Sequence, residues 1–222
     1  MAAPAMRYNG STSPYPLEAE VPRKALKACD TIIMDVESAA AYDRQAEATH
    51  WHGPEIVFGL AFEFTRPGQT LLDLGIGSGL SSIHFHKAGL HVLGLDGSRL
   101  VLKICEAKGF AKELREHDLR ELPLPYPPAS VDVVVSVAVL HSFPELDALF
   151  LDIARILRIG GIFAFTLENR RLGLPGRYFV GRRLASSASH SGDAVRLFRH
   201  RPEDVANWLL KAGITILKTQ EF

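Results

Sequence analysis

The chain has 222 residues, of which 47% are hydrophobic and 23% charged, and its 25 basic residues balance its 25 acidic ones. This composition excludes a globally disordered chain, and the neutral balance argues against a strongly cationic nucleic-acid binder. The cysteines, Cys29 and Cys105, are too few for a disulfide scaffold or a cysteine-based zinc site. No apolar run approaches the roughly 20 residues that span a bilayer. We therefore expect a cytoplasmic protein.

The N-terminal part predicts a lead-in followed by a helical extension. Four prolines among small and polar residues in positions 1–22 are typical of a flexible segment, and we place the lead-in at residues 1–38. Apolar spacing predicts a helix over about 39–50 and a second helix that begins near Pro54. Residues 39–222 then form a single domain, in which residues 39–66 are a helical lid.

Short apolar runs alternate with helix-like segments in the rest of the chain. Strands are predicted at 70–74, 91–95, 111–117, 131–139, 161–166 and 214–217, and helices at 81–88, 98–108, 146–157 and 202–212. Most of the strands are apolar throughout, as expected when helices cover both faces of a sheet. The pattern predicts a Rossmann-like α/β fold with an open, mostly parallel twisted sheet.

A glycine cluster, Asp73-Leu74-Gly75-Ile76-Gly77-Ser78-Gly79, follows the first predicted strand. Glycines in this strand-to-helix turn let the backbone approach a ligand closely. Asp96 ends the second strand, 21 residues after Gly75, where an acid can reach ribose hydroxyls. A nicotinamide dehydrogenase would need a third glycine where this chain has Leu80. The order of the glycine cluster and Asp96 predicts a nucleoside site. Leu80 argues against a nicotinamide dehydrogenase.

These segments resemble the motifs of class I S-adenosylmethionine (SAM)-dependent methyltransferases, most closely those of the broad small-molecule branch. The resemblance is carried, in family order, by residues 72–79, 95–98, 117–119 with 122–124, 131–141, and 157–161, where Ile159 replaces a usual proline. The family sheet usually has seven strands, and the sequence leaves no residues for a seventh after the run at 214–217.

The resemblance implies that SAM is the cofactor. The residues it implies for cofactor binding are Asp73, Gly75, Ile76, Gly77, Asp96, Gly97, Asp118, Leu119 and Ser136. Asp73 would lie near the methionine end, Asp96 would hold the ribose and Asp118 would accept from the adenine amine. Methyl transfer from a sulfonium needs alignment rather than a metal, so we predict no metal site. His84 and His86 are two apart on a predicted helix and point to different faces, which suits a helix surface.

Three residues are candidates for acting on the methyl acceptor. His141 follows the fourth strand, where it could remove a proton from the acceptor or serve as a structural histidine. Tyr42 and Trp51 precede the first strand, and related enzymes place N-terminal helices over the site. These two residues could therefore contact the acceptor, with core packing as the alternative.

The sequence favours methyl transfer to an O or N atom of a small molecule, with no membrane partner. Residues 169–201 contain eight arginines and one acid, so an anionic acceptor is one hypothesis and a solvated loop is the other. An RNA methyltransferase that uses this segment is a less favoured alternative, because the whole chain is neutral. A non-catalytic SAM-binding or regulatory protein is another.

Overall fold

The computed structural model describes residues 43–44, 46, 48, 51–167 and 198–220. Its helices after residue 50 are α2 (Gly53–Phe62), α3 (Ser82–Lys87), α4 (Arg99–Ala107), the 3-10 helix η1 (Leu140–Ser142), α5 (Asp147–Ile156) and α7 (Pro202–Lys211). Its strands are β1 (Thr70–Leu74), β2 (His91–Asp96), β3 (Glu113–Glu116), β4 (Val131–Ser136) and β5 (Leu157–Phe165). The four described residues of the predicted 39–50 helix are helical.

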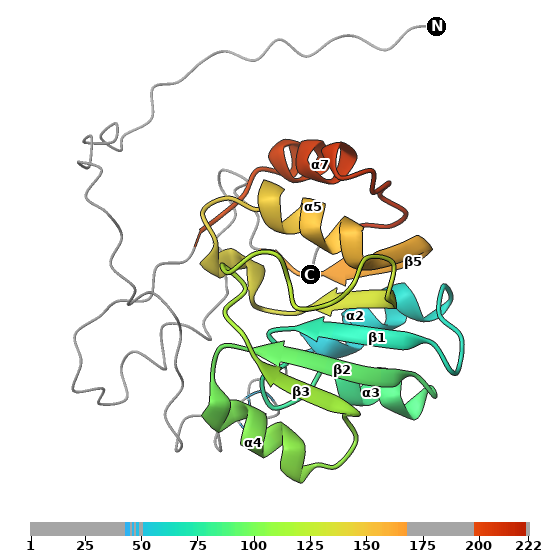
Figure 1. Ribbon diagram of the computed structural model, residues 1–222, viewed down its shortest axis with the longest axis vertical. Helices are drawn as coiled ribbons and strands as arrows, with labels where there is room; N and C mark the ends of the chain where they lie inside the picture. Colours follow the sequence, from blue (N-terminus) through green and yellow to red (C-terminus); the bar gives the residue numbers. More distant parts are fainter. Residues whose placement is uncertain (1–42, 45, 47, 49–50, 168–197, 221–222) are drawn as a thin grey trace, which may run out of the picture.

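The five strands of the described chain form one sheet in the order β3-β2-β1-β4-β5, and every neighbouring pair is parallel (Figure 1). The chain runs outward from β1 to β3 and then returns to place β4 on the other side of β1. The carboxyl ends of β1 and β4 therefore flank the point at which the strand order reverses, where ligands bind in open α/β sheets. The predicted Rossmann-like fold is confirmed.

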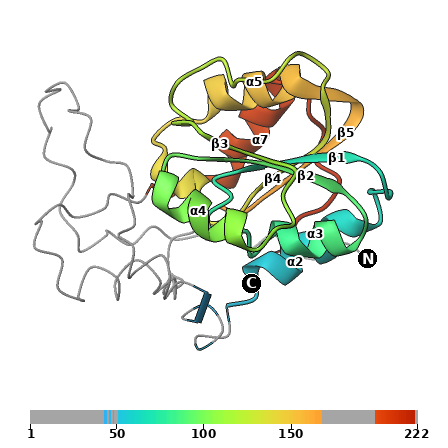
Figure 2. The ribbon, with the colours of Figure 1, turned by 60° about the horizontal axis from the view of Figure 1, so that its bottom comes forward.

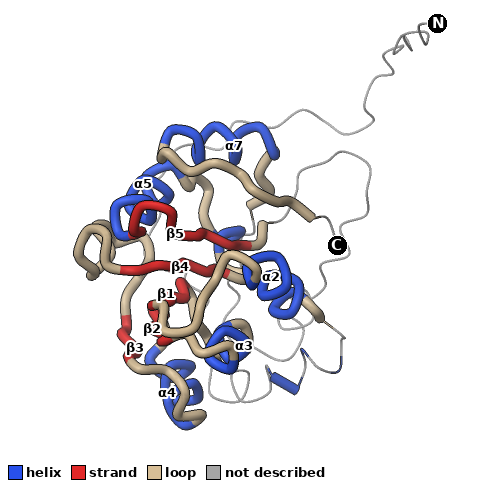
Figure 3. Tube along the Cα trace, turned by 90° about the vertical axis from the view of Figure 1, so that its right-hand side faces the viewer, coloured by secondary structure: helices blue, strands red, loops and turns tan. Residues whose placement is uncertain are grey.

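Helices cover both faces of the sheet (Figures 2 and 3). Leu72 and Val134 lie in a buried cluster with residues of α5 and with Leu209 of α7. Leu71 and Val133, one position earlier on the same strands, lie in a second cluster with residues of α2, α3 and α4. Successive strand residues point to opposite faces, so a strand covered on both faces must be apolar throughout.

The loop between β3 and β4 is fastened to α5. Asp152 accepts from the backbone N–H of Leu124 at 2.6 Å, and Arg155 donates to the carbonyls of Tyr126 at 2.8 Å and Leu124 at 3.1 Å. Asp152 and Arg155 also pair with each other at 2.5 Å. These bonds fix the segment that follows Asp118 and Leu119 at the edge of the sheet.

The largest differences from the predicted strand boundaries are at the end of β4 and at the start of β5. β4 ends at Ser136 rather than at residue 139, because Ala138 has a φ of 59°, which a strand cannot accommodate. β5 begins at Leu157, immediately after α5, although the predicted strand began at residue 161. A register shift between Val131 and Val133 accompanies this irregular first half of β5.

The predicted strand at 214–217 is wrong. Gly213, with a φ of 73°, ends α7, and the N–H of Ile214 donates back to the carbonyl of Leu209 at 2.9 Å. The chain beyond this turn has no regular secondary structure through residue 220. Lys218 instead pairs with Glu63 after α2 and lies 5.4 Å from the ring centre of Phe64. The turn therefore directs the segment toward the end of α2 and out of a strand pairing.

Candidate functional site

The glycine loop at the carboxyl end of β1 is anchored to β2. The N–H groups of Gly75 and Ile76 both donate to the carbonyl of Leu95, at 2.8 and 2.9 Å. Gly75 has a φ of 76°, and a Cβ built on it would lie 2.4 Å from a methyl group of Val139. Ile76 is buried, and the absence of a side chain on Gly94 makes room for it. Ile76 therefore offers its backbone rather than its side chain to the site.

Asp96 joins the end of β2 to the glycine loop. One of its carboxylate oxygens accepts from the N–H of Gly77 and the other from the N–H of Ser98, both at 2.9 Å. Burial raises the pKa of Asp96, and the two backbone hydrogen bonds oppose that rise. Each oxygen has a second lone pair, so the carboxylate can still accept from two ribose hydroxyls. Gly97, between these contacts, is partly exposed.

Asp73 lies behind the loop and is 1% exposed. Its carboxylate accepts from the hydroxyl of Ser82 in α3 at 2.5 Å. Burial raises the pKa of Asp73 to about 7; the Ser82 hydrogen bond opposes this rise, and the charge of Asp96 adds to it. The structure thus places two carboxyl groups with raised pKa values on either side of one loop, which is typical of a functional site.

The remaining predicted cofactor residues are held by protein groups. The hydroxyl of Ser136, which is fully buried, donates to the carbonyl of Leu74 at 2.9 Å and so joins β4 to β1. Asp118 is partly exposed and pairs with the Arg120 side chain at 2.6 Å, which lowers the pKa of Asp118. Leu119 is buried in the core cluster that includes α5. These placements leave their roles toward a cofactor as predictions.

His141 lies in η1, on the loop that follows β4. Its carbonyl accepts from the N–H of Phe198 at 2.6 Å, and the N–H of Ala138 donates to the hydroxyl of Thr166 at 2.7 Å. Ala138 itself is in the left-handed region, a strained conformation that often marks functional sites. The loop is therefore fixed at the carboxyl edge of the sheet, where a group acting on an acceptor would be expected.

The helical residues before α2 lie against the glycine loop. Asp43 accepts from the hydroxyl of Ser78, which is buried in that loop, and pairs with Lys108 at the end of α4 at 2.5 Å. Trp51 folds over the start of α2, where a Cβ on Gly53 would lie 2.6 Å from its ring. Tyr42 and most of residues 169–201 lie outside the described residues.

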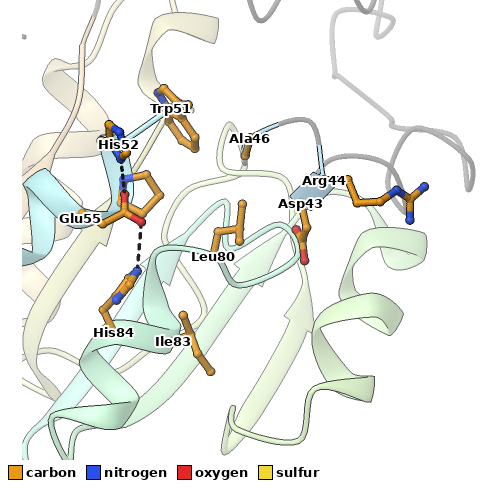
Figure 4. A pocket seen from close by; sticks show the side chains of 10 residues that line it. Asp43, Arg44, Ala46, Trp51, His52, Glu55, Leu80, Ile83 and His84 are labelled. Carbon is orange, nitrogen blue, oxygen red and sulfur yellow. Dashed lines mark ion pairs between the residues drawn. The ribbon is translucent and has the colours of Figure 1, made fainter. Parts of the chain in front are cut away.

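A cavity of about 410 Å³ lies between these N-terminal residues, α2 and α3 (Figure 4). Its lining residues come from the segments on both sides of the glycine loop: Asp43, Arg44, Ala46, Trp51, His52, Pro54, Glu55, Leu80, Ile83 and His84. Trp51 is one of the lining residues, and its predicted contact with the acceptor stays a prediction. Sequence reasoning missed Asp43, Glu55 and His84, because their proximity depends on how three helices pack.

The described residues contain neither a metal-ligand cluster nor a membrane-spanning helix. No group of three or more histidine, cysteine, aspartate or glutamate side chains among them could hold a metal ion. None of the described helices has the length and apolar character to cross a membrane.

Comparisons with known proteins identify a methyltransferase domain in this chain. Residues 72–165, from within β1 to the end of β5, match the family described as "Methyltransferase domain". A probable SAM-dependent methyltransferase of Mycolicibacterium smegmatis is 30% identical over 132 residues, which cover 60% of this chain and 51% of that protein. Residues 72–165 are therefore a methyltransferase domain, and the chain is similar to SAM-dependent methyltransferases.

Two further relatives match over more of this chain. A ubiquinone biosynthesis O-methyltransferase of Xanthomonas euvesicatoria is 25% identical over 158 residues, which cover 67% of this chain and 64% of that protein. The crystal structure of a SAM-dependent methyltransferase from Mesorhizobium loti superimposes with a TM-score of 0.57 and 26% identity, covering 74% of this chain and 83% of that chain. The chain spans about half to two thirds of the two curated relatives.

Proposed function

We propose that this chain transfers a methyl group from SAM to an O or N atom of a small molecule. The observation that supports the proposal most directly is the bond from the Gly77 N–H to Asp96, which places a carboxylate with unused lone pairs against a glycine loop whose two side chains, of Ile76 and Ser78, are buried. That arrangement suits the ribose of SAM, because a carboxylate can accept from both hydroxyls. Bound SAM supplies a methyl group that is already activated by its sulfonium.

The residues of this chain would divide the remaining tasks. Gly75 and Gly77 would let the backbone lie close to the cofactor, and Asp118 and Leu119 would contact the adenine, as the resemblance to the family implies. His141 is proposed to face the acceptor from the loop after β4. The relatives include a malonyl-[acyl-carrier protein] O-methyltransferase and a ubiquinone biosynthesis O-methyltransferase, so their names support O-methylation without selecting an acceptor.

The assignment of Asp96 can be tested by titration calorimetry with SAM and with S-adenosylhomocysteine. We expect Asp96→Ala to lose about 1.5–3 kcal/mol of binding free energy, the scale of hydrogen bonds to a charged group. Asp96→Asn should lose less, because its amide oxygen can still accept one hydrogen bond. Glu145→Gln, at an exposed acid between η1 and α5, is the control. Equal affinity of wild type and Asp96→Ala would contradict the ribose assignment.

The alternative functions predict different results for the same purified protein. A non-catalytic SAM-binding protein would bind SAM, with an affinity that falls in Asp96→Ala, but would transfer no methyl group to any compound in a broad panel of acceptors. An RNA methyltransferase would transfer tritiated methyl groups to bulk tRNA or rRNA, with a rate that falls as salt rises. Transfer to acidic small molecules that also weakens with salt would support the hypothesis of an anionic acceptor.

A further inference from the structure

The cavity has one polar corner, which is built from α2 and α3. Glu55 lies between two histidines: its Oε1 is 3.7 Å from Nε2 of His84, and its Oε2 is 4.0 Å from Nδ1 of His52 (Figure 4). Both separations exceed the length of a hydrogen bond. The carboxylate and the His84 ring therefore face each other across a gap in which a hydroxyl about 2.8 Å from both atoms could fit.

His84 is the better held of the two histidines. Its side chain is 29% exposed, against 65% for His52, and its ring centre lies 5.7 Å from that of Phe58 in α2. Phe58 in turn meets Phe85 edge to face at 5.0 Å. Aromatic packing between α2 and α3 thus fixes the ring that borders the gap, and preorganisation of this kind is what proton transfer in a site requires.

The other charged residues of the cavity are directed elsewhere. Asp43 accepts from Ser78 and pairs with Lys108. The Arg44 side chain extends away from Glu55 in Figure 4. On α3 itself, His86 packs against Phe110, with ring centres 5.7 Å apart. Glu55 is therefore the charged group that His84 faces among the described lining residues, and His52 lies on the other side of Glu55.

The rest of the lining is mainly apolar. Trp51, Pro54, Leu80 and Ile83 provide an aromatic ring and three aliphatic side chains beside the polar corner. A planar ring that carries a hydroxyl group complements both parts, because the ring can pack against Trp51 while the hydroxyl enters the gap. Leu80 directly follows the glycine loop, so this ligand would lie next to the proposed cofactor site.

We propose that Glu55 and His84 form the acid–base pair for the acceptor, and that the acceptor is a small hydroxylated aromatic compound. This inference rests on the proposed methyl transfer. The hydroxyl proton passes to the His84 imidazole, and Glu55 stabilises the resulting cation. The oxygen lone pair forms the new O–CH₃ bond while the C–S bond breaks and leaves its electron pair on sulfur. His84 then returns the proton to water.

The probe for this site is 4-nitrocatechol, whose ionisation is visible by absorbance. With the wild-type chain we expect binding, ionisation of the bound phenol at lower pH than in water, and methylation when SAM is added. His84→Gln and Glu55→Gln should lose the ionisation shift and slow methylation at least tenfold, with unchanged SAM affinity. His86→Gln is the matched control on the opposite face of α3 and should behave as wild type.

Two results would overturn the inference: wild type that binds no 4-nitrocatechol, or a His84→Gln variant indistinguishable from His86→Gln. Glu55 is half exposed, so Glu55→Gln tests the pair even if His84→Gln unfolds. Calorimetry with SAM separates the two proposals. If the chain binds no SAM, the proposed methyl transfer is wrong. Ionisation of 4-nitrocatechol that depends on His84 would still show that the cavity binds a hydroxylated aromatic compound.

Discussion

Asp73 shows how one residue can link the candidate site to stability. It is buried at the end of β1 and hydrogen-bonded to Ser82, and burial raises its pKa to about 7. An unfolded chain would ionise this group near 3.8. Between these two values the native state holds a proton that the unfolded state has lost, so stability must fall as pH rises through that interval.

We predict that Asp73→Asn removes this dependence. The amide resembles the protonated acid and can still accept from Ser82. Wild-type stability should fall by up to about 1.4 kcal/mol per pH unit between pH 4 and 7 from this group alone. The variant should lack that contribution and should exceed wild type above pH 7. Urea unfolding at several pH values measures both slopes.

Asp147→Asn is the control, because Asp147 lies on the exposed first turn of α5. It should retain the wild-type pH slope. An Asp73→Asn slope equal to that of wild type would show that Asp73 is ionised throughout this range, contrary to its burial.

At the scale of elements, the helical residues before α2 and the glycine loop are joined through Asp43. The carboxylate accepts from the buried Ser78 hydroxyl and pairs with Lys108, whose side chain is 30% exposed. A partly exposed ion pair contributes at most about 1 kcal/mol, whereas a buried hydroxyl left without a partner costs about 1–3 kcal/mol. The bond to Ser78 should therefore dominate.

We predict a graded loosening of the loop when this junction is cut. Asp43→Ala removes both contacts and should raise amide hydrogen exchange of residues 76–79 most. Asp43→Asn keeps an acceptor for Ser78, so it should resemble Lys108→Met, with a smaller increase. Lys103→Met, at an exposed lysine on α4, should leave exchange unchanged. If Asp43→Ala matches that control, the loop is held without the N-terminal helix.

The sequence predicts elements well where local and tertiary demands agree. Continuous apolar runs located β1 and β2, and the glycines between strand and helix located the loop, because only glycine accepts Gly75's backbone angle without strain. The run at 214–217 satisfied the same local rule. Its failure to pair was set by the turn at Gly213 and the contacts of Lys218, which no local pattern records.

The candidate site residues also divide into those that local sequence predicts and those that only tertiary packing brings together. Asp73 and Asp96 follow from position on a strand that the chain order already fixes. Glu55 and His84 are 29 positions apart on separate helices, and they meet only because Phe58 and Phe85 pack α2 against α3. Sequence spacing correctly predicted that His84 and His86 face apart, as their contacts with Phe58 and Phe110 show. It could not indicate what either histidine would face.

On the scale of the whole molecule, ligand binding should be measurable as global stability. The glycine loop, β2 and β4 all meet at the candidate site, so a ligand that bridges them binds the folded chain and not the unfolded one. At a concentration 100 times its Kd, S-adenosylhomocysteine should then stabilise wild type by about 2.7 kcal/mol. Asp96→Ala should gain less at that concentration, and NADH should give no shift because Leu80 replaces the third glycine of a nicotinamide site. Thermal unfolding with each ligand measures the shifts, and stabilisation by NADH alone would identify a dinucleotide site in place of the proposed one.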